Sequence, residues 1–322
     1  MNINRILAAE NRLRGHSRVT PLLNAPLLDA EIGRRIFLKA ECLQKTGSFK
    51  YRGARSALSA LDAETRSRGV LAYSSGNHAQ GVALAAKELG INAVIIMTNA
   101  APTLKIENTR SYGAEVILYD RASEDRDAIG ATLSEDRGLV LLKPYDNPEV
   151  IAGHGTVGLE IAMQAGAHSV SDAQVLVCCG GGGLTSGIAL ALADRAPGFR
   201  VHTVEPEGFD DVARSLAKGE IQHNARNTGS ICDAILTPAP GEQTFPILKA
   251  HCGDGITVTD AEAMRALAIA FAHFKVVLEP GGAAALAAAL FRSQGTSDII
   301  AVGSGGNVDA DVFAHALAQH AS

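Results

Sequence analysis

One short turn of the sequence, residues 46–50, combines a lysine with the residue types that shape tight turns. An alternating apolar stretch at residues 36–41 precedes it and predicts a short strand. A helical pattern runs from Phe49 to Leu61 and places Lys50 in the first helical turn. The positive end of the helix dipole disfavours an ammonium there, so we expect a lowered pKa at Lys50 and an amine that forms imines with carbonyl groups. The alternative is an ordinary exposed helix lysine.

A second feature is a run of four glycines, Gly180, Gly181, Gly182 and Gly183. It separates a predicted strand at 174–178 from a predicted helix at 184–195. Backbone amides in such a loop approach an anion closely, and the helix dipole favours negative charge, so the loop suits a phosphate. Glu205 follows roughly 20 residues later, as the ribose-binding acid of a dinucleotide site does, which makes an NAD-dependent oxidoreductase an alternative. However, Ser186 replaces the third glycine of that motif, and this function leaves Lys50 without a role.

A third feature is the loop Ser74-Ser75-Gly76-Asn77-His78, between a predicted strand at 69–73 and a predicted helix at 79–89. Its hydroxyl groups, its amide side chain and the N-terminal amides of the helix could bind a carboxylate. The alternative is a loop that only caps the helix.

Strands and helices alternate along most of the chain, which predicts parallel sheets covered by helices. Further strands are expected at 93–97, 115–119, 139–142, 200–204 and 299–302. Further helices are expected at 2–15, 104–112, 125–137, 156–165, 259–274, 283–291 and 309–319. The helix from Thr259 opens with a capping box, because Glu262 stands three residues later. Residues 208–256 read as a long irregular region.

Composition narrows the class of protein. With 322 residues, of which 47% are hydrophobic and 20% charged, the chain can bury a large core and is expected to form two domains. A net charge of −5 and an aromatic content of 4% argue against a nucleic-acid binder. The five cysteines form no CxxC pair, so we expect neither a disulfide framework nor a cysteine zinc site but a cytoplasmic protein. No signal peptide or membrane span is evident.

Four stretches occur in the order in which one enzyme family carries them: residues 47–54, 74–81, 180–183 and 304–307. Through them the chain resembles the fold-type II, tryptophan-synthase-β-like enzymes that use pyridoxal 5'-phosphate (PLP), specifically the serine/threonine dehydratase, serine racemase and 3-hydroxyaspartate dehydratase group. The resemblance implies an α/β fold with two domains of three-layer, open, twisted sheets. It also implies a lyase that removes water and ammonia from serine, threonine or 3-hydroxyaspartate to give a 2-oxo acid. An amino-acid racemase on the same scaffold is the alternative.

The resemblance implies roles for the motifs. Lys50 is expected to bind the cofactor covalently and, once the substrate releases it, to act as the base at the α-carbon. The residues expected to hold the cofactor are Lys50, Asn77, Gly180, Gly181, Gly182, Gly183, Leu184 and Ser304. Among them the glycines would bind the phosphate, Asn77 the ring hydroxyl and Ser304 the pyridine nitrogen, where a neutral hydroxyl favours elimination over transamination. The residues expected to receive the substrate carboxylate are Ser74, Ser75, Asn77 and His78.

Ser75 stands where many dehydratases of the group have alanine. The serine racemases and 3-hydroxyaspartate dehydratases instead resemble the Ser-Ser-Gly-Asn-His of this chain. A hydroxyl on the face opposite Lys50 could exchange a proton at the α-carbon, and Ser75 is therefore a second candidate catalytic residue that would permit racemisation. The alternative is a serine that caps the next helix.

Residues 205–211 resemble the divalent-cation loop of serine racemase. Glu205, the backbone carbonyl of Phe209 and Asp211 match its ligand positions. These hard oxygen donors suit Mg²⁺, or else Ca²⁺ or Mn²⁺, with waters completing the shell. The alternative is an ordinary acidic surface loop. The match also removes Glu205 from the ribose-binding role.

Three basic residues bear on the substrate. Lys143 stands where relatives often have histidine, and His154 where they often have glutamine. Cationic groups near the cleft could pair with the second carboxylate of 3-hydroxyaspartate; solvent-facing positions without a function are the alternative. Arg126 aligns with a substrate-side arginine of serine racemase, although an exposed arginine is common on so polar a helix.

The resemblance also predicts the organisation of the chain. Residues 1–64 and 148–322 are expected to form the larger, PLP-binding domain, and residues 65–147 the smaller one. The cofactor would lie in the cleft between them. A homodimer is expected, with a small amino acid as the substrate. Only one further helix follows Asn307, which leaves no room for an appended regulatory domain, so we expect amino-acid catabolism without end-product control.

Overall fold

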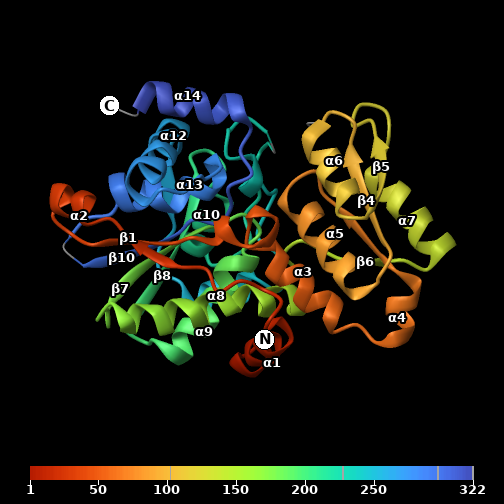
Figure 1. The fold of residues 1–322 in the computed structure, drawn as a ribbon, viewed down its shortest axis with the longest axis horizontal. Coiled ribbons are helices and arrows are strands. Elements are labelled where there is room, and N and C mark those ends of the chain that lie inside the picture. Colours follow the sequence, from red (N-terminus) through yellow and green to blue (C-terminus); the bar gives the residue numbers. More distant parts are fainter. Residues whose placement is uncertain (102, 227, 296, 321–322) are drawn as a thin grey trace.

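The computed structural model describes residues 1–320 except 102, 227 and 296, and it contains two sheets (Figure 1). The larger sheet has the strand order β1-β2-β10-β7-β8-β9. Its strands are β1 (Leu22–Asn24), β2 (Ile36–Lys39), β10 (Asp298–Val302), β7 (Ala173–Cys178), β8 (Phe199–Pro206) and β9 (Ile256–Val258). Only β1 is antiparallel to its neighbour. The smaller sheet, β5-β4-β3-β6, is parallel throughout and consists of β3 (Val70–Tyr73), β4 (Ala93–Thr98), β5 (Glu115–Tyr119) and β6 (Val140–Leu141).

Helices cover both faces of each sheet. Residues 1–200 contain α1 (Ile3–Leu13), α2 (Pro26–Ile32), α3 (Lys50–Ser59), α4 (Ala63–Arg68), α5 (Asn77–Leu89), α6 (Thr103–Ser111), α7 (Arg126–Arg137), α8 (Pro148–Ala167) and α9 (Gly183–Arg195). The rest contains α10 (Asp211–Lys218), α11 (Phe245–His251), α12 (Asp260–Ile269), α13 (Pro280–Ala287) and α14 (Ala310–His320), with π-helical turns at Ala270–Phe274 and Ala288–Arg292. No described helix is both apolar enough and long enough to cross a bilayer.

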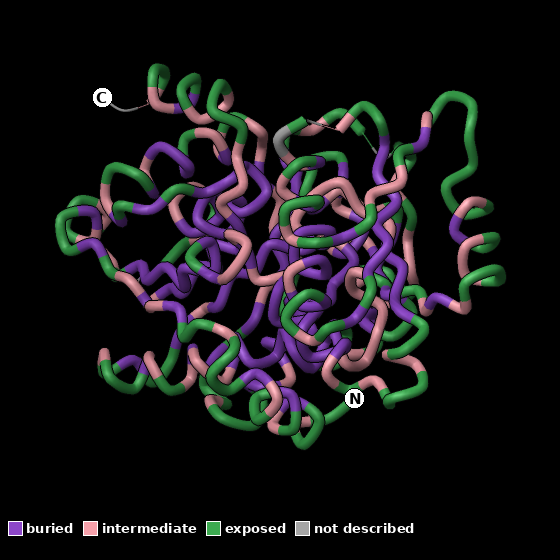
Figure 2. The backbone as a smooth tube through the Cα atoms, turned by 45° about the vertical axis from the view of Figure 1, so that its right-hand side comes forward, coloured by how far each residue is buried: buried purple, intermediate pink, exposed green. Residues whose placement is uncertain are grey.

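The side chains of the central strands alternate between the two faces of the sheet, and this alternation explains the helical layers. In β10, Ile299 and Ala301 pack with α12 and α13, whereas Ile300 and Val302 pack with α8 and α9. Successive side chains of a strand point to opposite faces, so a strand that is apolar at every position must be covered twice. The same rule gives the smaller sheet α5 on one face and α7 on the other. Figure 2 shows the buried backbone in the interior, with green exposed segments around it.

The strand–helix alternation predicted from the sequence is confirmed, with the smaller sheet formed entirely by residues 70–141. The domain boundaries at residues 65 and 147 stay a prediction. The capping box at Thr259 and Glu262 is present. The region 208–256 is less irregular than expected, because α10, α11 and β9 lie within it. These elements are 3 to 8 residues long, too short for a clear periodic pattern.

The helix predicted at 156–165 in fact begins at Pro148, where Asn147 caps it. Gly153 and Gly155 hid its first turns, since glycine disfavours a helix interior. They are present because neighbouring helices approach closely. A Cβ added at Gly155 would lie 2.7 Å from Ile6 Cδ1, and one added at Gly158 would lie 2.8 Å from Ala191 Cβ. α8 is therefore the helix on which α1, α3 and α9 pack.

A buried ionic cluster anchors the helix that begins at Lys50. The Arg52 guanidinium donates to Glu41 at 2.8 Å and to Glu160 at 2.7 Å, and the Lys39 ammonium also donates to Glu160 at 2.6 Å. These pairs join β2, α3 and α8. Arg52 is fully enclosed, so each charge needs its partner to remain buried. The cluster fixes α3 two residues from Lys50.

Candidate active site

The residues predicted to hold a cofactor gather around one cavity at the carboxyl ends of the strands of the larger sheet. All eight of them line it: Lys50, Asn77, Gly180, Gly181, Gly182, Gly183, Leu184 and Ser304. They come from α3, α5, the loop between β7 and α9, and the segment after β10. Parallel strands bring such loops together at one edge of the sheet, which is where open α/β folds place their ligands. The cavity is called the inner cavity below.

Lys50 is held by a tight turn that is paired with the chain after β10. Thr46 and Gly47 have φ angles of 61° and 75°, which turn the chain into α3. The Phe49 amide donates to the Ser304 carbonyl at 3.1 Å, and the Gly306 amide donates to the Gly47 carbonyl at 2.9 Å. Two motifs separated by more than 250 residues in the sequence are thereby joined, and they present Lys50 and Ser304 to the same cavity.

Burial lowers the pKa of Lys50 to about 8, and the nearby Glu279 carboxylate opposes this shift. The direction agrees with the sequence-based expectation, but the physical cause differs. Lost hydration, rather than the helix dipole, is the main cause. The amine donates to the Pro144 carbonyl at 3.1 Å. Such a lysine is neutral in about a tenth of the molecules at pH 7, far more than an ordinary lysine, and only the neutral amine is a nucleophile.

The glycine loop leads from β7 into α9, with Gly182 at the N-cap in a left-handed conformation (φ 89°). A Cβ at Gly181 would overlap the Tyr145 ring, and one at Gly183 would lie 3.0 Å from the Tyr145 Cα. Side chains are therefore excluded, and backbone amides at the start of α9 form this wall of the cavity. The hydroxyls of Thr185 and Thr237, which also line it, are buried without a hydrogen-bond partner in the described structure. Amides, a helix N-terminus and two unsatisfied hydroxyls fit a phosphate group.

Asn77 and Ser304 line the same cavity, together with a residue that the sequence reasoning missed. The Asn77 side chain donates to the buried Glu279 carboxylate at 2.5 Å. Ser304 is buried, and its hydroxyl bonds to no carboxylate among the described residues. Glu279 precedes Pro280, the first residue of α13. An acidic residue before a proline that opens a helix was a usable signal, but the helix was predicted to begin only at residue 283.

The loop before α5 lies beside this cavity, but Ser74, Ser75 and His78 are not among its lining residues. The Ser74 hydroxyl accepts the Gly76 amide at 3.2 Å. Nε2 of the buried His78 lies 3.1 Å from the Leu142 carbonyl, and burial lowers the pKa of His78 to about 3. This imidazole is therefore neutral and already engaged. The carboxylate-binding role assigned to Ser74, Ser75, Asn77 and His78 stays a prediction.

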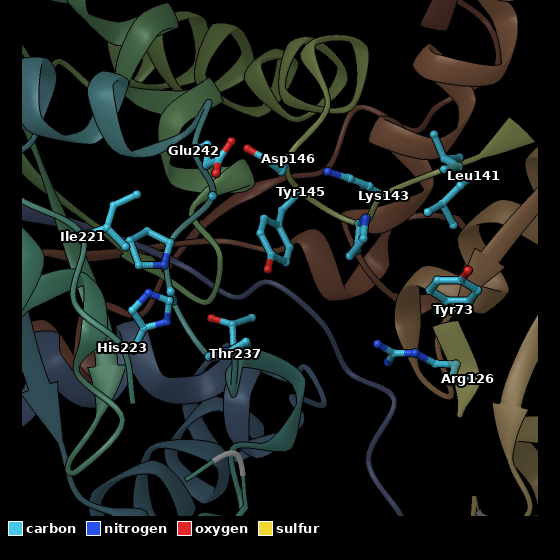
Figure 3. Close-up of a pocket in the computed structure, with 16 residues that line it drawn as sticks. Tyr73, Arg126, Leu141, Lys143, Tyr145, Asp146, Ile221, His223, Thr237 and Glu242 are labelled. Carbon is cyan, nitrogen blue, oxygen red and sulfur yellow. The ribbon is translucent and has the colours of Figure 1, made fainter. Parts of the chain in front are cut away.

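An outer cleft of about 740 Å³ adjoins the inner cavity and shares Tyr145 and Thr237 with it. Figure 3 shows Tyr73 and Arg126 on one side of this cleft and His223 on the other, with Tyr145 between them. The Arg126 guanidinium lies 5.0 Å from the centroid of the Tyr73 ring, a cation–π contact. Lys143 is exposed and lines the cleft as well.

Both expectations for His154 are wrong. Its side chain is completely buried, its ring centroid lies 4.7 Å from that of Phe49, and burial lowers its pKa well below the usual range. It is neither a cation for a substrate carboxylate nor a solvent-facing residue. In this position it packs behind the turn that carries Lys50.

The acidic loop is only partly at the surface: Glu207 and Gly208 are exposed, but its candidate ligand residues are not. Glu205, Phe209 and Asp211 are buried. The Glu205 carboxylate accepts the amides of Val212 and Ala213 at 2.9 and 2.7 Å, and one Asp211 oxygen accepts from Asn224 at 2.5 Å. Burial and mutual repulsion raise the pKa of Glu205, and burial raises the pKa of Asp211 to about 6.

Two features of this loop bear on a metal. The second oxygen of Asp211 has no partner in the described structure. Two buried carboxylates with one unsatisfied oxygen fit a hard cation. However, no group of three or more His, Cys, Asp or Glu side chains with metal-binding geometry is present among the described residues.

Comparisons with known proteins agree with this geometry. The family model described as "Pyridoxal-phosphate dependent enzyme" matches residues 13–305. An L-threo-3-hydroxyaspartate ammonia-lyase of a Pseudomonas species is 43% identical over 317 residues, which cover 97% of this chain and 97% of the relative. A serine racemase of Schizosaccharomyces pombe is 42% identical, covering 98% and 96% of the two chains.

Solved structures agree as well. A threonine deaminase from T.th. matches with a TM-score of 0.90 and 42% identity over 96% of this chain and 99% of the other. Maize serine racemase matches with a TM-score of 0.91 and 37% identity over 99% and 98%. The predicted tryptophan-synthase-β-like fold is confirmed. None of these relatives is named as a nicotinamide enzyme, and Glu205 is occupied by amides of α10 instead of facing a ribose site.

Proposed function

We propose, from the premise that this chain belongs to the pyridoxal-phosphate dependent enzyme family, that it is an ammonia-lyase for a small β-hydroxy amino acid. The observation that carries the proposal is the convergence of all eight candidate cofactor residues on the inner cavity. The products would be a 2-oxo acid and ammonia. The test is ammonia release from serine, threonine and 3-hydroxyaspartate in both enantiomers. Release from none of them would contradict the proposal.

The inner cavity supports PLP through its donors. When bound, this cofactor supplies an aldehyde that forms an imine with an amine and a ring that withdraws electrons from the substrate α-carbon. Gly180, Gly181, Gly182 and Gly183 would hold the phosphate with their amides at the start of α9, helped by Thr185 and Thr237. Asn77 would donate to the ring hydroxyl. Ser304 would face the pyridine nitrogen with a neutral hydroxyl. Leu184 would cover the cofactor with an apolar side chain.

Among the side chains of the protein, Lys50 would be both the attachment point of the cofactor and the base. Its amine, with a pKa of about 8, is neutral often enough to form a covalent link and to accept a proton. Once released by the substrate amine, the same nitrogen would take the α-proton and hold it as an ammonium beside the Pro144 carbonyl.

The outer cleft favours a dicarboxylic substrate. Arg126 and Lys143 bring two cationic groups to its rim, and an arginine binds a carboxylate through two parallel hydrogen bonds. The Pseudomonas and Saccharomyces cerevisiae relatives are named L-threo-3-hydroxyaspartate ammonia-lyases. We therefore place 3-hydroxyaspartate before serine and threonine as the substrate.

Arg126→Ala tests this assignment. We expect KM for 3-hydroxyaspartate to rise about tenfold, because a charge-assisted hydrogen bond contributes about 1.5 kcal/mol, whereas KM for serine changes little. Steady-state ammonia release with both substrates measures the difference. Arg137→Ala is the matched control, since Arg137 lies on the same helix and pairs with Glu115 away from the cleft. An equal rise in KM for both substrates would show that Arg126 does not select the second carboxylate.

We also propose a divalent cation, Mg²⁺ or else Ca²⁺ or Mn²⁺, at Glu205, the Phe209 carbonyl and Asp211. The buried charge of this loop and the unsatisfied Asp211 oxygen support it. We expect a chelator to lower the melting temperature and Mg²⁺ to restore it, because a ligand bound only by the folded state stabilises it. Asp211→Asn should remove this response, whereas Asp194→Asn, which alters an exposed ion pair, should retain it. A melting temperature that ignores the chelator would contradict the metal site.

Three further expectations remain proposals. A homodimer is supported by the resemblance alone, and its mass in solution would test it. The cytoplasm is supported by five cysteines that form no disulfide in the structure. The division into residues 1–64 with 148–322 and 65–147 is supported by the two sheets. Racemisation is the weaker alternative activity, because Ser75 does not line the cavity that Lys50 lines.

A further inference from the structure

Glu279 is a buried carboxylate in the wall of the inner cavity, and the functional assignment above gives it no role. It is the N-cap residue of α13, but its side chain makes no capping hydrogen bond. The carboxylate instead points at Gly305, where a Cβ would overlap its Oε1. The residue after Ser304 must therefore be small for the carboxylate to fit. Both the helix start and the Ser304 segment are shaped around this side chain.

A chain of amide hydrogen bonds ends on this carboxylate. Asn307 Nδ2 donates to the Thr46 carbonyl at 2.8 Å and to Asn77 Oδ1 at 2.7 Å. Asn77 Nδ2 then donates to Glu279 Oε1 at 2.5 Å. An ionised carboxylate only accepts hydrogen bonds, so it and Asn307, which also donates to the Thr46 carbonyl, together fix which end of the Asn77 amide carries the donor. The oxygen of Asn77 is used by Asn307, and one N–H remains for a ligand in the cavity.

Several charged groups surround Glu279. Burial raises its pKa to about 7, and Asp233 of the 3-10 turn Asp233–Ile235 acts in the same direction. Hydrogen bonding from Asn77 lowers its pKa, as do the positive charges of Lys105 on α6 and Lys50 on α3. The Cys42 thiol is also nearby: burial raises its pKa, and the charge of Glu279 adds to that shift. The start of α13 favours the anion. The carboxylate can therefore change charge near neutral pH.

We propose that Glu279 is the positioning residue that holds the free N–H of Asn77 toward the bound cofactor, and that it does so firmly only when ionised. This rests on the proposed function, because the cofactor is the group that Asn77 would meet. Protonation of Glu279, or its replacement by glutamine, supplies a donor as well as an acceptor. Asn307 still occupies the Asn77 oxygen, but the charge-assisted bond that holds the Asn77 N–H is replaced by a neutral one of about half its strength.

The experiment compares the PLP-loaded wild-type enzyme with Glu279→Gln at about pH 6 and about pH 8, either side of the pKa. Two readouts are taken: the PLP retained per chain after gel filtration and kcat/KM for ammonia release. At the higher pH we expect both the PLP affinity and kcat/KM of Glu279→Gln to be about tenfold lower. At the lower pH the two proteins should converge, because the wild-type carboxyl is then protonated too.

Two further variants identify the titrating group and its route of action. Asp233→Asn removes a nearby negative charge and should move the wild-type midpoint to lower pH. In an Asn77→Ala background, Glu279→Gln should have little further effect, since contacting residues are energetically coupled. A tenfold loss that is the same at every pH, or that persists fully without Asn77, would overturn the proposal. A wild-type enzyme that retains no PLP would instead contradict the proposed function, so the two failures are distinguishable.

Discussion

Replacing Lys50 by alanine is expected to lower ammonia release at least about a thousandfold, which is the largest effect that the structure predicts for one side chain. Lys50 is the amine in the inner cavity, and burial lowers its pKa to about 8. The substitution removes both the covalent link to the cofactor and the base for the α-proton. The fold should survive, because the lost ammonium is a poorly hydrated charge that donates to the Pro144 carbonyl rather than to a carboxylate. Ammonia release and thermal unfolding of the variant measure the two effects separately.

Lys45→Ala is the matched control. Lys45 lies five residues earlier and pairs with Glu88 at 2.7 Å outside the cavity. An exposed pair of this kind contributes about 0–1 kcal/mol, so its removal should leave kcat within about twofold. If Lys50→Ala retained a tenth or more of the wild-type activity, Lys50 would not be the essential amine.

Gly182→Ala is expected to weaken PLP binding about thirtyfold. Gly182 has a φ angle of 89°, where an alanine costs about 1–2 kcal/mol. The added Cβ would also lie 2.8 Å from Leu248 Cδ1 and 2.9 Å from Thr244 Oγ1, and overpacking costs a further ~1 kcal/mol or more. The loop can relieve both only by leaving the shape in which its amides point at the phosphate. Titration of the variant with PLP measures the loss.

Gly33→Ala separates backbone strain from damage to the site. Gly33 ends α2 with a φ angle of 74°, and nothing lies within 4 Å of an added Cβ. The Gly33→Ala variant should lose about 1 kcal/mol in its free energy of unfolding and keep the wild-type PLP affinity. Equal PLP affinity in Gly182→Ala and the wild type would show that the glycine loop does not hold the phosphate.

The parts of the site that the sequence predicted are those with local patterns. The glycine run and the serine-rich loop each follow a strand and open a helix, so residue type and periodicity place them at one edge of a parallel sheet. Lys50 was found in the same way. The direction of its pKa shift followed from its position at the start of a helix, but its main cause, burial by distant segments of the chain, has no local pattern.

The parts that sequence reasoning missed depend on contacts between distant segments. Asn77 donates to Glu279, about 200 residues away in the sequence, and neither residue type predicts this hydrogen bond. Because His154 is polar, it was expected to be a cation near the cleft or a solvent-facing residue, but its ring is buried beside Phe49. The first turns of α8 contain glycines that make space for other helices. Because glycine has a low helix propensity, these turns were predicted to be a loop. In each case tertiary packing overrides the local preference.

Borohydride reduction of the PLP-loaded protein, followed by peptide mapping, tests the central claim most directly. Reduction converts an imine between cofactor and lysine into a stable secondary amine, so the modified residue can be identified by mass. We expect one adduct per chain, on the peptide that contains Lys50, and none in Lys50→Ala. An adduct on another lysine, or no adduct in a protein that retains PLP, would contradict the account.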